Sequence, residues 1–252
     1  MIFLGVDLET TGLDLEKSRI VEIAAISYDS DYDNYTNFLS KLLWDSSYTQ
    51  ELWTNAEKIH GIPRDLCQKQ GATAPLVLME LITLMEDCHY VVAHNGINYD
   101  KPILENECNR WGLKLPKRPW IDTSTDIAYP ENIQTRRLNY LLTDHDIYNP
   151  VKHRAIFDVF FMMELFRKYP LDSIVKRASS PTVQAIVSCG RENKPLHALL
   201  KSRRFRFDGK SFAWVKLIKQ CDLEEETKAL GGVEPAIIPK NKKRRFVTSC
   251  SV

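Results

Sequence analysis

The chain has 252 residues, of which 44% are hydrophobic, 10% aromatic and 27% charged. This composition supplies enough apolar surface for a sizeable core and excludes a chain that is disordered overall. The length suits one large domain with a small second one, or a single large α/β domain. The 34 Lys and Arg against 33 Asp and Glu give a formal net charge of +1, and this total points to no charged partner.

The apolar run at residues 2–6 is too short for a signal peptide or a membrane span, so we expect a soluble protein with no membrane partner. The cysteines are scattered without a C-x-x-C pair, which favours reduced, mostly buried thiols and a location that is cytoplasmic or otherwise intracellular, not secreted. There are six of them: Cys67, Cys88, Cys108, Cys189, Cys221 and Cys250.

The first part of the chain predicts strands followed by alternating helices and strands. Apolar or alternating patterns indicate strands at residues 1–9, 19–28 and 35–43, which form the simplest antiparallel meander. Two short buried strands are expected at 90–93 and 120–122. Helical spacing is found at 75–88, 98–111, 138–142 and 154–168. This order predicts an α/β domain built on a mixed sheet.

The near-zero net charge conceals two oppositely charged parts. Residues 1–172 carry 17 basic and 26 acidic side chains, whereas residues 173–252 carry 17 and 7, which gives −9 and +10. Such a separation indicates an electrostatic role for the basic part. Strand patterns at 183–187, 205–207 and 212–218, with helices at 194–202 and 223–230, predict a small α+β module there. We therefore divide the chain into a domain (1–171), a basic module (172–232) and a basic, disordered tail (233–252).

Two carboxylates lie close together at the end of the first strand. Asp7 and Glu9 are two residues apart, so both side chains point to the same face. Like charges at that distance raise a pKa strongly unless a divalent cation makes both ionised forms favourable. The alternative for this pair alone is a solvated strand end. The Thr10-Thr11-Gly12 turn that follows allows a ligand to approach the backbone closely.

Two further aspartates and a histidine follow in the chain. Asp100 comes at a helix start after a buried strand and, taken alone, favours a helix-capping role. Asp158 lies inside a strongly apolar helix, where a carboxylate is costly to bury unless it is paired or bound to a metal. His153 falls on the loop before that helix, and a mobile imidazole beside carboxylates suits a general base.

These residues fall in three motifs: DLETTG beginning at Asp7, VAHNGINYD ending at Asp100, and HRAIFD running from His153 to Asp158. In order, residue type and spacing they resemble the three motifs of the DEDDh, or DnaQ-like, 3′→5′ exonuclease family, which includes the proofreading subunit of the bacterial replicative polymerase. The resemblance covers roughly residues 1–170. It implies an RNase H-like mixed sheet flanked by helices.

The resemblance also implies a role for each motif residue. Asp7, Glu9 and Asp158 would bind one divalent ion, Asp7 would share a second with the substrate phosphate, and Asp100 would ligate or position through water. Oxygen ligands suit Mg²⁺ or Mn²⁺. Two such ions would activate water and stabilise the leaving oxygen. His153 would take the proton of the water, and the products would be nucleoside 5′-monophosphates.

Other residues match the family less specifically. Thr10, Leu13, His60 and Tyr99 would line the pocket for the 3′ base and sugar. Ordinary packing is the alternative for Leu13 and Tyr99, and a turn position is the alternative for His60. In the basic module the residues that could grip phosphates are Arg203, Arg204, Arg206 and Lys210. The interleaved aromatics there favour a small core, and the basic run at 240–245 fits a solvated tail, a DNA tether or a nuclear signal.

The sequence thus predicts a metal-dependent 3′→5′ exonuclease acting on single-stranded or frayed DNA 3′ ends in DNA replication or repair. A polymerase or another replication or repair protein is an expected partner. One alternative is an RNA-trimming exoribonuclease, since the same site handles both sugars. Another is a recruitment subunit, in which the basic module holds nucleic acid or a polymerase and the nuclease fold is a scaffold.

Overall fold

The computed structural model describes residues 1–53, 56–151 and 153–239. The contacts between residues divide the chain into two compact units, Met1–Ala178 and the chain from Ser179 onward. The basic run at 240–245 and Cys250 lie outside the described residues. Three of the described cysteines, Cys67, Cys88 and Cys108, are buried. No helix in the described ranges is long and apolar enough to span a membrane.

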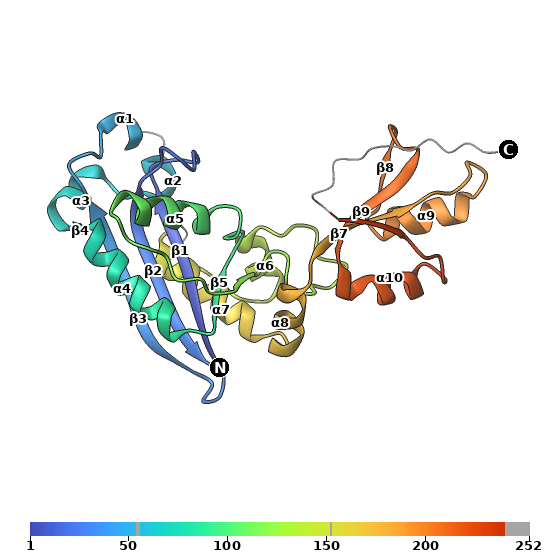
Figure 1. Ribbon diagram of the computed structural model, residues 1–252, viewed down its shortest axis with the longest axis horizontal. Helices are drawn as coiled ribbons and strands as arrows, with labels where there is room; N and C mark the ends of the chain where they lie inside the picture. Colours follow the sequence, from blue (N-terminus) through green and yellow to red (C-terminus); the bar gives the residue numbers. More distant parts are fainter. Residues whose placement is uncertain (54–55, 152, 240–252) are drawn as a thin grey trace. The chain divides into compact units, whose positions relative to one another are not determined.

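A six-stranded mixed sheet forms the centre of the first unit, in the order β4-β3-β2-β1-β5-β6 (Figure 1). The predicted antiparallel meander is confirmed in β1 (Ile2–Thr10), β2 (Ile20–Asp29) and β3 (Asn34–Trp44). β5 (Tyr90–Ala93) runs parallel to β1, and β6 (Trp120–Asp122) runs parallel to β5. The two-residue β4 (Ala72–Thr73), which the sequence pattern did not predict, pairs with the end of β3. The predicted α/β architecture is therefore confirmed.

Helices cover both faces of this sheet because alternate strand residues are apolar on each side. On one face, α4 (Ala74–Asp87) and α5 (Asp100–Arg110) pack on Leu4, Val6 and Leu8 of β1. On the other face lie α6 (Leu138–Asp144), α7 (Ala155–Arg167) and α8 (Leu171–Ser179), packed around Phe3. Asp7 and Glu9 share the second face, which places them on the side of α7.

The contact between α7 and β1 is close because residue 5 is glycine. A Cβ at Gly5 would lie 2.7 Å from Met163 Cγ and 3.1 Å from Val159 Cγ1, both on α7. Such separations are shorter than van der Waals contact, so a larger residue would force the Met163 and Val159 side chains, or the helix itself, to shift. Gly5 thus sets how near α7, which carries Asp158, comes to the strand that carries Asp7.

Three short helices follow β3: α1 (Gln50–Trp53), α2 (Glu57–His60) and α3 (Arg64–Gln70). The sequence pattern did not predict them, since they are too short to show a helical period. They are held by a separate apolar cluster that includes Tyr48, Trp53 and Ile62, and Trp53 Nε1 donates to the Ile62 carbonyl at 2.9 Å. This cluster fixes the turn that contains His60.

The second unit contains a four-stranded antiparallel sheet in the order β10-β7-β9-β8. Its elements are β7 (Thr182–Val187), α9 (Lys194–Ser202), β8 (Arg206–Asp208), β9 (Ala213–Lys219), the 3-10 helix η1 (Gln220–Asp222), α10 (Leu223–Ala229) and β10 (Ala236–Pro239). Buried Val183, Ala185, Leu200 and Phe205 lie in its small core. The strands and helices predicted for this part of the chain are all present.

The prediction of a disordered tail beginning at residue 233 is wrong for its first part. Residues 236–239 form β10, which pairs with β7 in the register Ala236↔Ile186 to Pro239↔Val183. The segment is too short to show alternation, and its backbone pairing with β7 stabilises it instead. The division between the units also falls after the boundary predicted at residue 171, because Ile174 of α8 is buried in the core of the first unit.

Candidate active site

Asp7 and Glu9 lie near the carboxyl end of β1, where the strand leads into the Thr10-Thr11-Gly12 turn. In the pairing with β2, Asp7 lies opposite Ala24 and Glu9 lies opposite Glu22. Two glutamates directly opposite each other repel. The sheet therefore brings carboxylates together here without neutralising them by its own pairing.

Asp100 reaches the same edge of the sheet because β5 runs parallel to β1. The loop after β5 turns back into α5, whose first residue is Asp100, and this carboxylate is 4% exposed. Gly96 makes the turn possible, since a Cβ there would lie 2.3 Å from Ala93 Cβ. The backbone N–H of Leu8 in β1 faces the Asp100 carboxylate and favours its ionised form, which partly opposes the effect of burial on its pKa.

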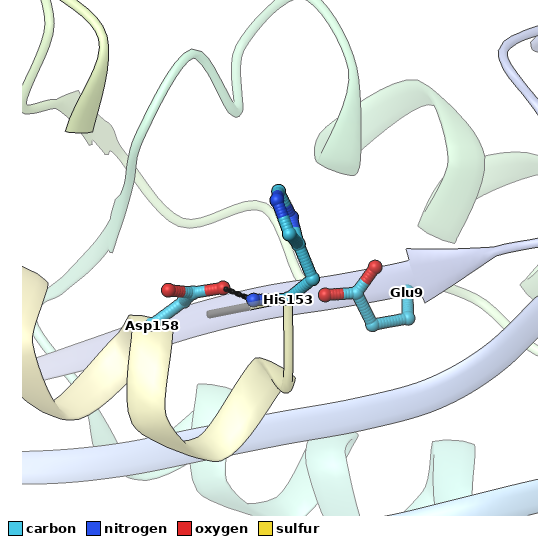
Figure 2. A group of neighbouring side chains, drawn as sticks. All are labelled: Glu9, His153 and Asp158. Atoms are coloured by element: carbon cyan, nitrogen blue, oxygen red, sulfur yellow. Dashed lines mark hydrogen bonds between the residues drawn. The ribbon is translucent and has the colours of Figure 1, made fainter. Parts of the chain in front are cut away.

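The start of α7 positions Asp158 and His153 (Figure 2). Asn149 Nδ2 donates to Asp158 Oδ1 at 2.8 Å, and the His153 backbone N–H donates to Asp158 Oδ2 at 3.0 Å. His153 has a φ of 59°, an uncommon value for a residue with a side chain. Its imidazole is exposed, and His153 lies between the carboxylates of Glu9 and Asp158 in Figure 2. Ligand atoms of the three side chains all lie within 4.8 Å of one another.

Burial and mutual repulsion make these carboxylates weak acids in the metal-free protein. Burial, and then repulsion by Asp100 and Glu9, raise the pKa of Asp7 well above its usual value. The pKa of Glu9 rises to about 8 and that of Asp100 to about 7, in both cases mainly through burial. Burial also raises the pKa of Asp158. Four crowded, oxygen-donating carboxylates of this kind fit a hard divalent cation, whose charge would favour their ionised forms.

This electrostatic cost predicts how the stability of the metal-free protein depends on pH. Glu9 ionises near 4.5 when exposed and near 8 in the fold, so the folded state holds more protons between these values. The free energy of unfolding should therefore fall as the pH rises from about 4.5 to about 8. Added Mg²⁺ or Mn²⁺ should raise Tm more at pH 8 than at pH 5.5, as measured by thermal unfolding. Metal-free Glu9→Gln should be more stable than the parent at pH 8; equal Tm values would contradict this account.

A buried ion pair that sequence reasoning missed holds the start of α7 against β2. Glu22 is 1% exposed, and its carboxylate accepts from Arg154 Nη2 at 2.9 Å and from the Ala155 backbone N–H at 3.0 Å. Arg154 is the residue after His153, so this pair fixes the backbone that carries the imidazole. The sequence signal was a charged residue in the otherwise apolar strand 20–28, and Asn149 was missed because nothing in its local pattern marks it.

Arg154→Met should destabilise the protein by about 1–3 kcal/mol, because it leaves the buried Glu22 carboxylate without its partly exposed charged partner. Urea unfolding at pH 7 measures the change. Arg154→Lys, which keeps the charge, should cost less. The double variant Glu22→Gln with Arg154→Met should be more stable than Arg154→Met alone, and a single variant within about 0.5 kcal/mol of the parent would contradict a structural role for the pair.

The residues predicted to hold the terminal nucleotide occupy different environments. The Tyr99 hydroxyl donates to the Gly12 carbonyl at 2.6 Å and is paired with the Thr10 hydroxyl, so Tyr99 fixes the turn after β1. Leu13 is 84% exposed, which is at odds with ordinary packing. His60 is buried; its Nδ1 accepts from the Ile62 N–H at 3.0 Å, and burial lowers its pKa to about 4. In the described part of the chain, its Nε2 has no hydrogen-bond partner.

A cleft of about 910 Å³ opens over the carboxylates. Asp7, Tyr99, His153 and Asp158 line it, whereas Thr10, Leu13 and His60 are not among its lining residues. Residues of the segment 135–140, which was not identified as part of the site, also line the cleft. The adjacent arginines at 136 and 137 were a usable sequence signal, but the overall acidity of residues 1–172 obscured it.

The basic residues singled out in the second unit fall into two groups. Arg203 is engaged inside the module, since its guanidinium pairs with the 4% exposed Glu226, to which Lys216 also donates. This pairing gives Arg203 a structural role instead of a place on an open basic surface. Arg204, Arg206 and Lys210 are exposed. Half of the predicted +10 comes from residues 240–252, which lie outside the described chain.

The chain matches one protein-family model and is similar in sequence to several known proteins. A family model described as "Exonuclease" matches residues 4–166. Over 165 residues the chain is 27% identical to DNA polymerase III PolC-type of Ureaplasma parvum, covering 64% of this chain and 11% of the polymerase. Over 182 residues it is 31% identical to exonuclease DPD1, chloroplastic/mitochondrial, of Arabidopsis thaliana, covering 66% of this chain and 55% of DPD1. The chain thus spans only part of the length of these relatives.

Among solved structures, exonuclease I has the same fold. One such structure superposes with a TM-score of 0.62 at 16% sequence identity, covering 91% of this chain and 67% of that one. Another is E. coli exonuclease I in complex with a dA16 oligonucleotide, with a TM-score of 0.59 and 16% identity. At such identities the likeness establishes the architecture, which agrees with the predicted RNase H-like sheet and helices.

Proposed function

Because the chain belongs to the exonuclease family whose model spans residues 4–166, we propose that it is a metal-dependent 3′→5′ exonuclease that removes nucleotides from single-stranded or frayed DNA 3′ ends. The observation that carries the proposal is the convergence of four carboxylates beside one exposed imidazole, at a cleft lined by Asp7, His153 and Asp158. Crowded carboxylates with raised pKa values in a cleft are typical of functional sites. A scaffold without catalysis would have no need for this electrostatic cost.

Asp7, Glu9 and Asp158 would hold one Mg²⁺ or Mn²⁺, and Asp7 would share a second with the substrate phosphate. When bound, the two ions would supply an activated water and charge stabilisation for an in-line displacement at phosphorus. Asp100, whose carboxylate faces the Leu8 N–H of β1, would ligate a metal ion or position one through water. The hydrogen bonds of Asp158 to Asn149 and to the His153 backbone would keep its carboxylate turned toward Glu9.

His153 would act as the general base. Its imidazole is exposed, and its backbone is held by the contact with Asp158, so the ring can accept a proton from the attacking water. The water oxygen forms a bond to phosphorus while the bond between phosphorus and the 3′ oxygen of the preceding nucleotide breaks, and that oxygen takes up a proton from solvent. The products are a nucleoside 5′-monophosphate and a strand shortened by one nucleotide, with a new 3′ hydroxyl.

The terminal nucleotide would be held on the side of the turn after β1. The exposed Leu13 offers an apolar surface to a base, and the Tyr99 ring lines the cleft. Thr10 would support Tyr99 through their hydroxyl pair. His60 is buried outside the cleft lining, so it would act on the substrate only by holding the turn at Ile62, to whose N–H its Nδ1 is bonded.

DNA is the favoured substrate because the names of similar proteins and structures refer to DNA polymerase and to a DNA oligonucleotide. The sequence relative is a DNA polymerase III of the PolC type, and the structural neighbour is an exonuclease I solved with a dA16 oligonucleotide. By the same reasoning a polymerase or another replication protein is a candidate partner, and one exonuclease I structure is an ExoI/SSB-Ct complex. The exposed Arg204, Arg206 and Lys210 would add phosphate contacts from the second unit.

The test uses matched DNA and RNA oligonucleotides labelled at the 3′ or the 5′ end, with Mg²⁺, Mn²⁺ or chelator. We expect labelled 5′-monophosphate to appear first from 3′-labelled DNA, and a ladder of shortened strands from 5′-labelled DNA. Chelator should abolish both. Faster shortening of the RNA oligonucleotide would favour an exoribonuclease, and mononucleotide release from the 5′ end would contradict the proposed polarity.

A further inference from the structure

One part of the cleft is built by residues 135–140, which the proposed chemistry does not use. Lining residues of this segment include Thr135, Arg137 and Tyr140, and the same cleft is lined by Asp7 and Asp158. The segment therefore borders the same cleft as the carboxylates, and its side chains are within reach of a substrate bound there.

Two large side chains, those of Arg137 and Tyr140, line the cleft at the start of α6 (Leu138–Asp144). Leu141 and Leu142 are buried in the core and anchor the helix. Arg137, which immediately precedes the helix, and Tyr140 are three residues apart, so they lie on the same side of the first turn. Both are exposed, Tyr140 at 57%.

The backbone before α6 is held in place by His94. Burial lowers the pKa of His94, so the imidazole is neutral. Its Nε2 is 2.8 Å from the Arg136 carbonyl oxygen, which can only accept, so Nε2 carries the proton. The Arg136 guanidinium stacks over the Tyr129 ring at 4.6 Å. Arg137 and Tyr140 therefore project from a fixed backbone, which lowers the entropy cost of binding a ligand.

Both side chains are exposed, and within residues 1–53, 56–151 and 153–239 Arg137 forms no ion pair and the Tyr140 ring contacts no other aromatic ring. A positive charge and an exposed ring face on one side of a short helix are the two elements that bind single-stranded nucleic acid: a phosphate contact and a stacking platform.

We propose that Arg137 and Tyr140 bind the nucleotides just upstream of the one being removed, with Arg137 on a phosphate and Tyr140 stacked on an unpaired base. This inference rests on the proposed function, because it assumes that a 3′ end lies at the carboxylates. A base stacked on Tyr140 cannot remain paired within a duplex. The enzyme would thus require several unpaired nucleotides at the 3′ end.

The test compares Arg137→Ala and Tyr140→Leu with the parent by two readouts. The first is the Kd for fluorescent dT10, measured by anisotropy with chelator, where hydrolysis does not occur. Each variant should bind about tenfold more weakly, and Arg137→Ala should reduce the salt dependence by about one released counterion. The second is hydrolysis of the p-nitrophenyl ester of thymidine 5′-monophosphate, which carries one nucleotide. Its kcat/KM should change by less than about twofold.

Lys117→Ala and Tyr32→Leu are matched controls, since both residues are exposed and neither lines the cleft. They should leave both readouts unchanged. The inference would be overturned if Arg137→Ala and Tyr140→Leu bound dT10 with the Kd of the parent. It would also be overturned if kcat/KM fell equally on the ester and on a 3′-labelled oligonucleotide. A parent protein that binds dT10 through these residues yet hydrolyses neither substrate would overturn the proposed function instead.

Discussion

Asp7→Asn is expected to lower kcat for release of the 3′ nucleotide by at least about 10³-fold in the presence of Mg²⁺ or Mn²⁺. Asp7 is central to the site, because its charge is repelled by four neighbouring carboxylates: Asp100, Glu9, Asp158 and Glu22. It would also be shared by both ions. Its removal should therefore eliminate several kcal/mol of transition-state stabilisation, and every 1.36 kcal/mol is a factor of ten in rate.

The same substitution should make the metal-free protein more stable. Asn has nearly the shape of Asp but carries no charge, so it relieves the repulsion that raises the pKa values around it. An inactive variant with a higher Tm than the parent at pH 8 would separate lost chemistry from misfolding. Activity within tenfold of the parent would show that Asp7 is not part of the reaction centre.

His153→Gln is expected to lower kcat by about 10²- to 10⁴-fold, the usual contribution of a positioned general base. The imidazole is exposed, so its loss should change the free energy of unfolding little. The backbone N–H of residue 153 should still donate to Asp158, because glutamine retains that group. The pH dependence of kcat measures the effect, and the variant should lose the limb of the profile that reports deprotonation of the base.

A second readout separates the base from a metal ligand. His153 lies within 4.8 Å of the ligand atoms of Glu9 and Asp158, so it could contribute to cation binding. If it acts as a base, the rise in Tm on adding Mn²⁺ should be the same in His153→Gln as in the parent. A much smaller rise in the variant would assign His153 to the metal site.

Most of the fold could be predicted because its signals are local. The apolar patterns of β1, β2 and α7 extend over nine or more residues, and Pro75 marks the start of α4. The short helices α1 to α3 and the strand β10 could not be predicted in this way. Their stability comes from packing and pairing with residues distant in sequence, such as Trp53 against Ile62 and Ala236 beside Ile186.

For the site, the motifs identified the residues that the structure brings together but not those that position them. Asp7, Glu9, Asp158 and His153 come together because β1 and α7 pack closely at Gly5. The Glu22 contact with Arg154 spans 132 residues of sequence, and the hydrogen bond from Asn149 depends on a loop conformation. Neither leaves a periodic signal. The excess of acidic residues in 1–172 likewise obscured the adjacent arginines at 136 and 137, which lie just before α6.

The measurement that tests the central claim most directly is a count of bound Mn²⁺ by electron paramagnetic resonance, with and without thymidine 5′-monophosphate. The account predicts one tightly bound ion in the free parent protein and two when the nucleotide supplies its phosphate. In Asp7→Asn both should be lost or greatly weakened. Binding of Mn²⁺ to Asp7→Asn with the affinity and number of the parent would contradict a metal centre built on these carboxylates.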